Sequence, residues 1–199
     1  GKERIERYMQ PGGRYSIADA IRDGATKPIH FMPRVGDWAV WGEKLDAVFE
    51  REFGQLPEGE REKLKTENAK LEVILKLPKR ITMIAEDIAK DFKERVRPNG
   101  FKAMLVCYDR ETCVLYKEAL DTLLGAEVSF PIYSPNPEKD KGKPQIQKYY
   151  LSDTERKKAI EDFKKTKPTD IIEAAKPDNR WRSVEIFIVC DMLTTGFDA

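Results

Sequence analysis

The stretch IFIVCDMLTTGFDA, residues 186–199, decides how this sequence is expected to fold. Its first five residues are apolar, and a polar loop that contains Gly196 follows them. A short apolar run that leads into such a loop is typical of a buried parallel strand, which presents a site at its carboxyl end. Because the sequence stops on this loop, we expect part of a larger protein and only half of a site.

Two similar apolar runs lie upstream, at residues 101–108 and 127–133, and the third strand is expected over residues 184–190. Asp109 opens a helical pattern after the first run, and a capping box from Ser152 to Glu155 opens another after the second. This alternation of strands and helices predicts an α/β fold with a parallel sheet.

Helices are expected before the sheet. Residues 17–23 form a short helix capped by Ser16 and stopped by Gly24, and residues 27–32 are extended. Apolar spacing predicts helices over residues 37–53, 57–75 and 78–96, the last of which begins at Pro78. We therefore divide the chain into an entry segment (1–36), a helical segment (37–99) and an α/β lobe (100–199).

Two stretches of the lobe are expected to be irregular. Residues 134–147 are rich in Pro, Lys and Gly, which predicts a mobile loop. Its lysines, among them Lys139 and Lys143, could touch a DNA backbone, but nearby acidic residues favour a solvated loop. Residues 166–183 are interpreted as an insertion.

The composition excludes several classes of site. The 36 Lys and Arg residues balance 35 Asp and Glu residues, so any nucleic-acid surface must be a local patch. The three cysteines lack CxxC spacing and favour buried thiols over zinc. A single histidine, His30, argues against Ser-His-Asp and His-rich metal chemistry. No long apolar segment or signal-like start is present, so we expect a cytoplasmic protein without a membrane partner.

The first candidate site is the Asp109-Arg110 loop. Arg110 stands beside a helix N-terminus, where a phosphate oxygen could be bound by backbone N–H groups and the guanidinium. The simpler interpretation, that Asp109 only caps the helix and Arg110 is solvated, is favoured by spacing alone.

The second candidate site is the closing loop. Thr194 and Thr195 supply hydroxyls, Gly196 permits close approach of a ligand, and Asp198 could accept a hydrogen bond from a ribose hydroxyl. An ordinary strand-to-helix turn explains the same residues equally well, and the pattern does not decide between these alternatives.

Three segments together resemble one known family: YSIADAIRDG (residues 15–24), FKAMLVCYDRETCVLYKEAL (101–120) and IVCDMLTTGFDA (188–199). They are similar to the motor, or R, subunit of type I restriction enzymes, a member of the superfamily 2 helicase group. The resemblance covers nearly the whole chain from Tyr15 onward and is strongest in the last hundred residues.

The resemblance implies that residues 100–199 are most of the second RecA-like lobe of an ATP-dependent DNA translocase. Residues 105–110 look like helicase motif IV, which implies a DNA-backbone or structural role for Asp109 and Arg110. Residues 191–198 look like motif V, so that Thr194 and Thr195 would face DNA, and Gly196 and Asp198 would line the nucleotide cleft. The implied partners are double-stranded DNA and the specificity and methyltransferase subunits.

The expected ligands of such a motor are ATP and Mg²⁺, held mainly by a first lobe. The present sequence has no G-x-x-x-x-G-K-[ST] phosphate loop and no Asp-Glu pair after an apolar strand, so we expect no ATP hydrolysis by this chain alone. No metal site, catalytic residue or separate cluster of carboxylates with a lysine stands out. The alternatives are a RecA-like binding or assembly module without catalysis, and the second lobe of another superfamily 2 helicase.

Overall fold

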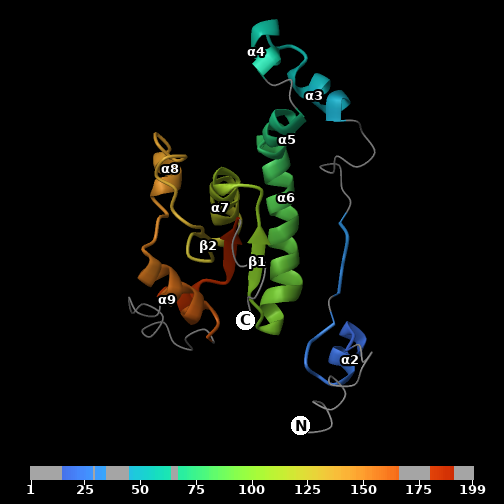
Figure 1. Ribbon diagram of the computed structural model, residues 1–199, viewed down its shortest axis with the longest axis vertical. Helices are drawn as coiled ribbons and strands as arrows, with labels where there is room; N and C mark the ends of the chain where they lie inside the picture. Colours follow the sequence, from blue (N-terminus) through green and yellow to red (C-terminus); the bar gives the residue numbers. More distant parts are fainter. Residues whose placement is uncertain (1–14, 29, 35–44, 64–66, 166–179, 191–199) are drawn as a thin grey trace. The chain divides into compact units, whose positions relative to one another are not determined.

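The computed structural model describes residues 15–28, 30–34, 45–63, 67–165 and 180–190 (Figure 1). The chain divides into two compact units, Gly1–Asp37 and Trp38–Ala199, which are considered separately. The four residues assigned to the closing loop, Thr194, Thr195, Gly196 and Asp198, lie outside the described part.

The first unit contains helix α2 (Ile17–Arg22), which the sequence predicted. Its capping box joins Ser16 and Asp19: the Asp19 N–H donates to Ser16 Oγ (3.2 Å), and the Ser16 N–H donates to Asp19 Oδ2 (3.0 Å). This backbone hydrogen bond from Ser16 helps to lower the pKa of Asp19 to about 2. Gly24 follows with a φ of +69°, a left-handed conformation that favours glycine. The described residues of the stretch expected to be extended, 27–32, form neither helix nor strand.

The second unit begins with helices. The described ones are α3 (Leu45–Phe53), α4 (Glu58–Lys63), α5 (Glu67–Leu75) and α6 (Pro78–Asp91). Helix α6 starts at Pro78 as predicted, buries Ile81, Ala85 and Ala89 along one side, and continues through a π-helical turn at Phe92–Val96. A 3₁₀ turn at Arg97–Asn99 and Gly100, with a φ of +72°, end the helix before the sheet.

The sheet contains three parallel strands, β1 (Ala103–Val106), β2 (Ser129–Ile132) and β3 (Ile186–Val189). Their spatial order is β1-β3-β2, so the last strand in the chain is the central one. The predicted parallel α/β arrangement is thus confirmed for the described residues.

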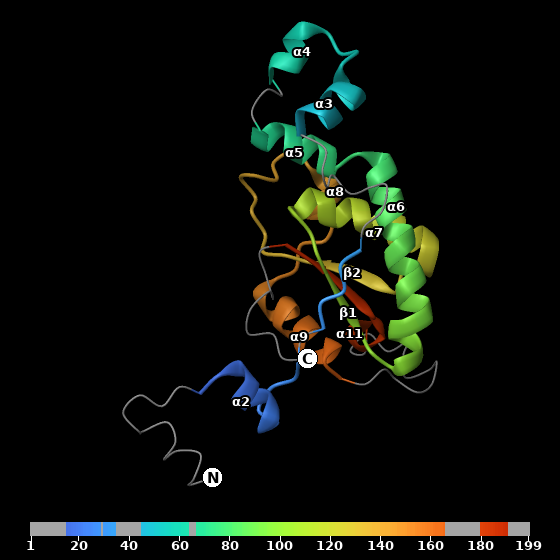
Figure 2. The same ribbon diagram turned by 90° about the vertical axis from the view of Figure 1, so that its right-hand side faces the viewer.

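Helices cover both faces of this sheet. Ile186 and Ile188 of β3 pack in one core cluster with α6 and α7 (Arg110–Leu124), which also pack against each other (Figure 2). Phe187 and Val189 face a second cluster with α9 (Asp153–Phe163) and α11 (Arg180–Ser183). Because both faces are buried, an uninterrupted apolar strand is the stable choice at the centre.

The structure corrects the prediction for residues 134–147. Instead of a solvated, mobile loop, this segment contains helix α8 (Pro144–Gln147) and buries Asp140 and Ile146. The hydroxyl of buried Tyr133 donates to the Ile146 carbonyl (2.8 Å), and Asp140 pairs with Arg110, so the segment is held to the lobe from two directions.

The structure also shows helix α11 at the end of the stretch interpreted as an irregular insertion; residues 166–179 lie outside the described part. In the parts of the chain that the structure describes, no helix is both long enough and apolar enough to cross a membrane.

Candidate functional site at the carboxyl edge of the sheet

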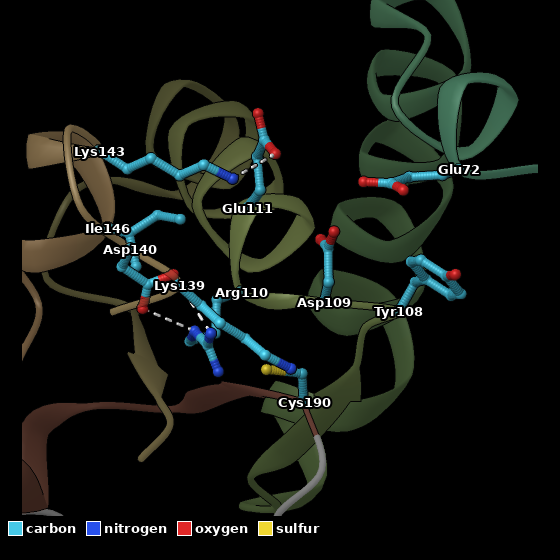
Figure 3. Close-up of a pocket in the computed structure, with 10 residues that line it drawn as sticks. All are labelled: Glu72, Tyr108, Asp109, Arg110, Glu111, Lys139, Asp140, Lys143, Ile146 and Cys190. Atoms are coloured by element: carbon cyan, nitrogen blue, oxygen red, sulfur yellow. Dashed lines mark hydrogen bonds and ion pairs between the residues drawn. The ribbon is translucent and has the colours of Figure 1, made fainter. Parts of the chain in front are cut away.

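The pairing of β1 with β3 brings the Asp109-Arg110 loop to the same edge of the sheet as Cys190, the residue that precedes the closing loop in the sequence. Val106 is in register with Val189, and the Cys107 N–H donates to the Val189 carbonyl (2.7 Å). The Asp109-Arg110 loop and Cys190, the residue before the closing loop, therefore leave the sheet at the same edge. A pocket of about 470 Å³ opens there, and Figure 3 shows its lining.

Asp109 occupies the N-cap of α7, as the simpler interpretation held. Its Oδ1 accepts hydrogen bonds from the N–H and the hydroxyl of Thr112 (2.7 and 2.6 Å), and its Oδ2 lies 2.8 Å from the Lys76 ammonium. Burial alone would raise the pKa of Asp109, but Lys76 and Thr112 outweigh it, and the net effect is a lowered pKa. Both carboxylate oxygens are thus engaged in holding the start of α7.

Lys76 stands at the centre of a cluster of carboxylates that the sequence did not reveal. Its Nζ lies 2.7 Å from Glu72 Oε1 and 2.9 Å from Glu111 Oε2, in addition to the contact with Asp109. Oxygens of Glu72, Asp109 and Glu111 all lie within 4.8 Å of one another, a spacing that would suit a cation. The Lys76 ammonium already fills that role. The residues come from α5 and α7 and are separated in sequence, so no local motif could have identified the cluster.

Arg110 does not point into solvent. Its Nε lies 2.8 Å from Asp140 Oδ2, an ion pair whose angles fall short of a hydrogen bond, and its Nη2 donates to Asp140 Oδ1 (3.2 Å). The Asp140 side chain is 3% exposed, whereas that of Arg110 is 21% exposed. The carboxylate is therefore more deeply buried than the guanidinium, to which dashed lines join it in Figure 3.

Asp140 is itself fixed by its surroundings. The Tyr150 hydroxyl donates to Asp140 Oδ2 (2.6 Å) and accepts from the Asn136 N–H (3.1 Å). The Asp140 carbonyl accepts hydrogen bonds from Gln147 Nε2 (2.9 Å) and from the Lys143 N–H (3.0 Å). Burial and the hydrogen bond to Asp140 raise the pKa of Tyr150, which keeps the phenol protonated as the donor.

Lys139 and Lys143 line the same pocket. Lys143 Nζ lies 3.7 Å from Glu111 Oε2, a loose ion pair. The Lys139 side chain extends across the pocket in the direction of Cys190 in Figure 3, and its ammonium has no ion pair within the described ranges.

The three cysteines, Cys107, Cys113 and Cys190, are free and buried, as predicted. The neighbouring Cys107 thiol and burial raise the pKa of Cys113. All three cysteines are members of the core cluster that also contains residues of α6 and α7, where each acts as a small apolar side chain.

Comparison with known proteins supports the resemblance read from the motifs. The chain is 31% identical over 204 residues to the putative type I restriction enzyme MjaVIIP endonuclease subunit of Methanocaldococcus jannaschii, covering 93% of this chain and 18% of that protein. It is 26% identical over 215 residues to the putative MjaVIIIP endonuclease subunit of the same organism, covering 96% of this chain and 20% of that protein. No protein-family model matches the chain. The chain thus spans about a fifth of the length of these relatives.

Proposed function

Because this chain is similar over nearly its whole length to a segment of type I restriction enzyme endonuclease subunits, we propose that it is part of the DNA translocase motor of such an enzyme. In this proposal, residues 100–199 are the second RecA-like lobe. The single observation that carries it is the pairing of β1 with β3, which brings the motif IV-like segment to the same edge of a parallel sheet as Cys190, the residue that precedes the motif V-like segment in the sequence. Ligands of open α/β sheets bind at this edge.

In this proposal the residues of the two loops have different roles. Arg110, Thr194 and Thr195 contact the DNA backbone, and Asp109 acts by fixing the start of α7 through Thr112 and Lys76. Gly196 and Asp198 line the nucleotide cleft. Closure of the two lobes on ATP then moves these DNA contacts along the duplex.

ATP with Mg²⁺, when bound, supplies the free energy of phosphoryl transfer, and in this proposal both are held mainly by the first lobe. The partners are double-stranded DNA, the specificity subunit and the methyltransferase subunit. The Lys76 cluster fits a structural ion-pair network, because its cation position is filled by the lysine, and we assign it no part in DNA cleavage.

The test uses the complete endonuclease subunit that contains this chain, assembled with its partner subunits. Asp198→Ala is expected to lower ATP hydrolysis with and without DNA, because the nucleotide cleft loses a polar contact. Thr195→Ala is expected to leave basal hydrolysis intact while lowering its stimulation by duplex DNA.

Two exposed residues provide matched controls. Asp153, 82% exposed at the start of α9, controls for the loss of a carboxylate, and Thr122, exposed on α7, controls for the loss of a hydroxyl. If Asp198→Ala and Thr195→Ala both retain the DNA-stimulated ATPase of Asp153→Ala and Thr122→Ala, the motor assignment fails and the non-catalytic module is favoured.

A further inference from the structure

We infer that Asp140 and Tyr150 are positioning residues, which hold the Arg110 guanidinium so that its remaining N–H groups bind a phosphate of the DNA backbone. The inference rests on the proposed function and extends it to two residues that no sequence motif marks. It assigns a purpose to the segment after β2, which the sequence predicted to be a solvated loop.

Asp140 fixes the orientation of the Arg110 guanidinium. Two nitrogens of Arg110 face the two oxygens of Asp140, so the plane of the guanidinium is fixed by the carboxylate. Nη1 makes no hydrogen bond within the described residues, and the side chain remains 21% exposed on the pocket side. A guanidinium held on one edge offers its other edge in a single orientation, which is how a phosphate is bound with little loss of side-chain entropy.

Burying the Asp140 carboxylate beside Arg110 costs free energy. A buried carboxylate loses much of its hydration, and pairing commonly does little more than offset that loss. Here the Asp140 side chain is 3% exposed, and a tyrosine hydroxyl is also committed to it. An apolar contact would hold the segment at least as well, so the network is better explained by the orientation that it gives Arg110.

The charges of the pocket balance, because four carboxylates face Arg110, Lys139, Lys143 and Lys76, so a phosphate is favoured only locally, beside Arg110 and Lys139. The acidic residues of the pocket already have cationic partners: Asp140 pairs with Arg110, whereas Glu72, Asp109 and Glu111 pair with Lys76. The pocket lining also contains Lys143, which pairs loosely with Glu111, and Lys139, which has no ion pair within the described residues. In this inference a backbone phosphate binds the outer edge of Arg110, with Lys139 as an added positive charge in the same pocket.

The test asks whether removal of a negative charge from Asp140 weakens DNA binding or leaves it equal or tighter. Asp140→Asn and Glu138→Gln each remove one negative charge from the same segment, but Glu138 is exposed and outside the pocket lining. If only net charge matters, both variants bind duplex DNA equally or more tightly than the parent. If Asp140 positions Arg110, Asp140→Asn weakens binding by about tenfold, and the slope of log K against log salt falls by about 0.9, the value for one lost phosphate contact.

Two further variants separate positioning from folding. Tyr150→Phe removes the hydrogen bond to Asp140 without changing charge, and we expect it to weaken DNA binding in the same direction by about threefold. Arg110→Lys keeps the charge but not the two-nitrogen geometry, so it should weaken binding like Asp140→Asn. When Arg110 is already replaced by lysine, Asp140→Asn should have little additional effect on DNA affinity, because Asp140 acts only by positioning the guanidinium.

Duplex binding is measured by fluorescence anisotropy on the complete endonuclease subunit that contains this chain, between about 50 and about 300 mM salt, with thermal unfolding of each variant recorded alongside. If the parent binds DNA and Asp140→Asn binds as tightly as Glu138→Gln, the positioning role is overturned while the proposed function stands. If Tyr150→Phe unfolds at the parent's temperature and binds DNA with the parent's affinity and salt slope, the positioning role is likewise overturned. Failure of the parent to bind duplex DNA at any salt overturns the DNA contact in the proposed function, and this inference with it.

Discussion

Replacement of Lys76 by methionine probes the ion-pair cluster that fixes the start of α7. The Lys76 side chain is 16% exposed and contacts carboxylate oxygens of Glu72, Asp109 and Glu111 at 2.7, 2.8 and 2.9 Å. Partly exposed ion pairs contribute about 0.2–1 kcal/mol each, so the three contacts together stabilise the fold by about 1–3 kcal/mol. Methionine keeps most of the aliphatic packing, and the loss should therefore be electrostatic.

The pH dependence of this loss has a definite sign. The pKa of Lys76 is raised by its three partners despite burial, so its contribution is complete below its ordinary pKa of 10.5. The pKa of Asp109 is lowered, so its contribution is complete above its ordinary value of 3.8 and is lost as pH falls further. At pH 7 both contributions are fully present in the parent.

In the Lys76→Met variant, three carboxylates within 4.8 Å of one another repel without a cation between them. Protonation then relieves the repulsion, so the difference in unfolding free energy between parent and variant should shrink as pH falls from 7 towards 4. Urea unfolding at both pH values measures this difference. Lys79→Met, at an exposed position on the first turn of α6, is the matched control and should change stability by less than about 0.5 kcal/mol. A loss for Lys76→Met that equals the control, or that grows on acidification, would refute the reasoning.

Three further predictions concern the core, a cap and a thiol. Phe187→Ala should lower the unfolding free energy by about 3–5 kcal/mol in urea denaturation, because the ring is fully buried and stacks on Phe163 at a centroid distance of 3.8 Å; a loss below about 1 kcal/mol would contradict the assigned core. Ser152→Ala should cost about 1 kcal/mol by the same measurement, since it removes the capping box of α9, and an unchanged midpoint would contradict that role. Cys113 should resist alkylation by iodoacetamide at pH 8 in the folded protein, because the neighbouring Cys107 thiol and burial raise its pKa; mass spectrometry that finds rapid labelling of the native state would disprove this.

The sequence predicted those features that depend on neighbouring residues. The apolar runs at residues 101–108, 127–133 and 184–190 each contain a strand. The physical reason is clearest for β3, because all four of its residues are buried and a strand buried on both faces must be apolar. The N-cap of α7 at Asp109 and the capping box at Ser152 were predicted for the same reason: a cap is a local interaction over three residues.

The sequence could not predict features that depend on the order of the strands. Nothing local places β3 between β1 and β2, although that order creates the shared edge. The burial of Asp140 was missed because its partner, Arg110, lies 30 residues away and its neighbours are lysines and glycine. A charged residue in a polar loop looks solvated until tertiary contacts are known, and the same holds for Lys76 and its three carboxylates.

The central claim, that this chain belongs to a DNA translocase motor, is tested most directly by movement along DNA. The complete enzyme, with Thr195→Ala or Thr122→Ala in its endonuclease subunit, is assayed for ATP-dependent displacement of a third strand from a triplex placed downstream of its recognition site. We predict that Thr195→Ala slows displacement by at least tenfold while Thr122→Ala displaces at the parent rate. Displacement by Thr195→Ala at the parent rate would contradict the account.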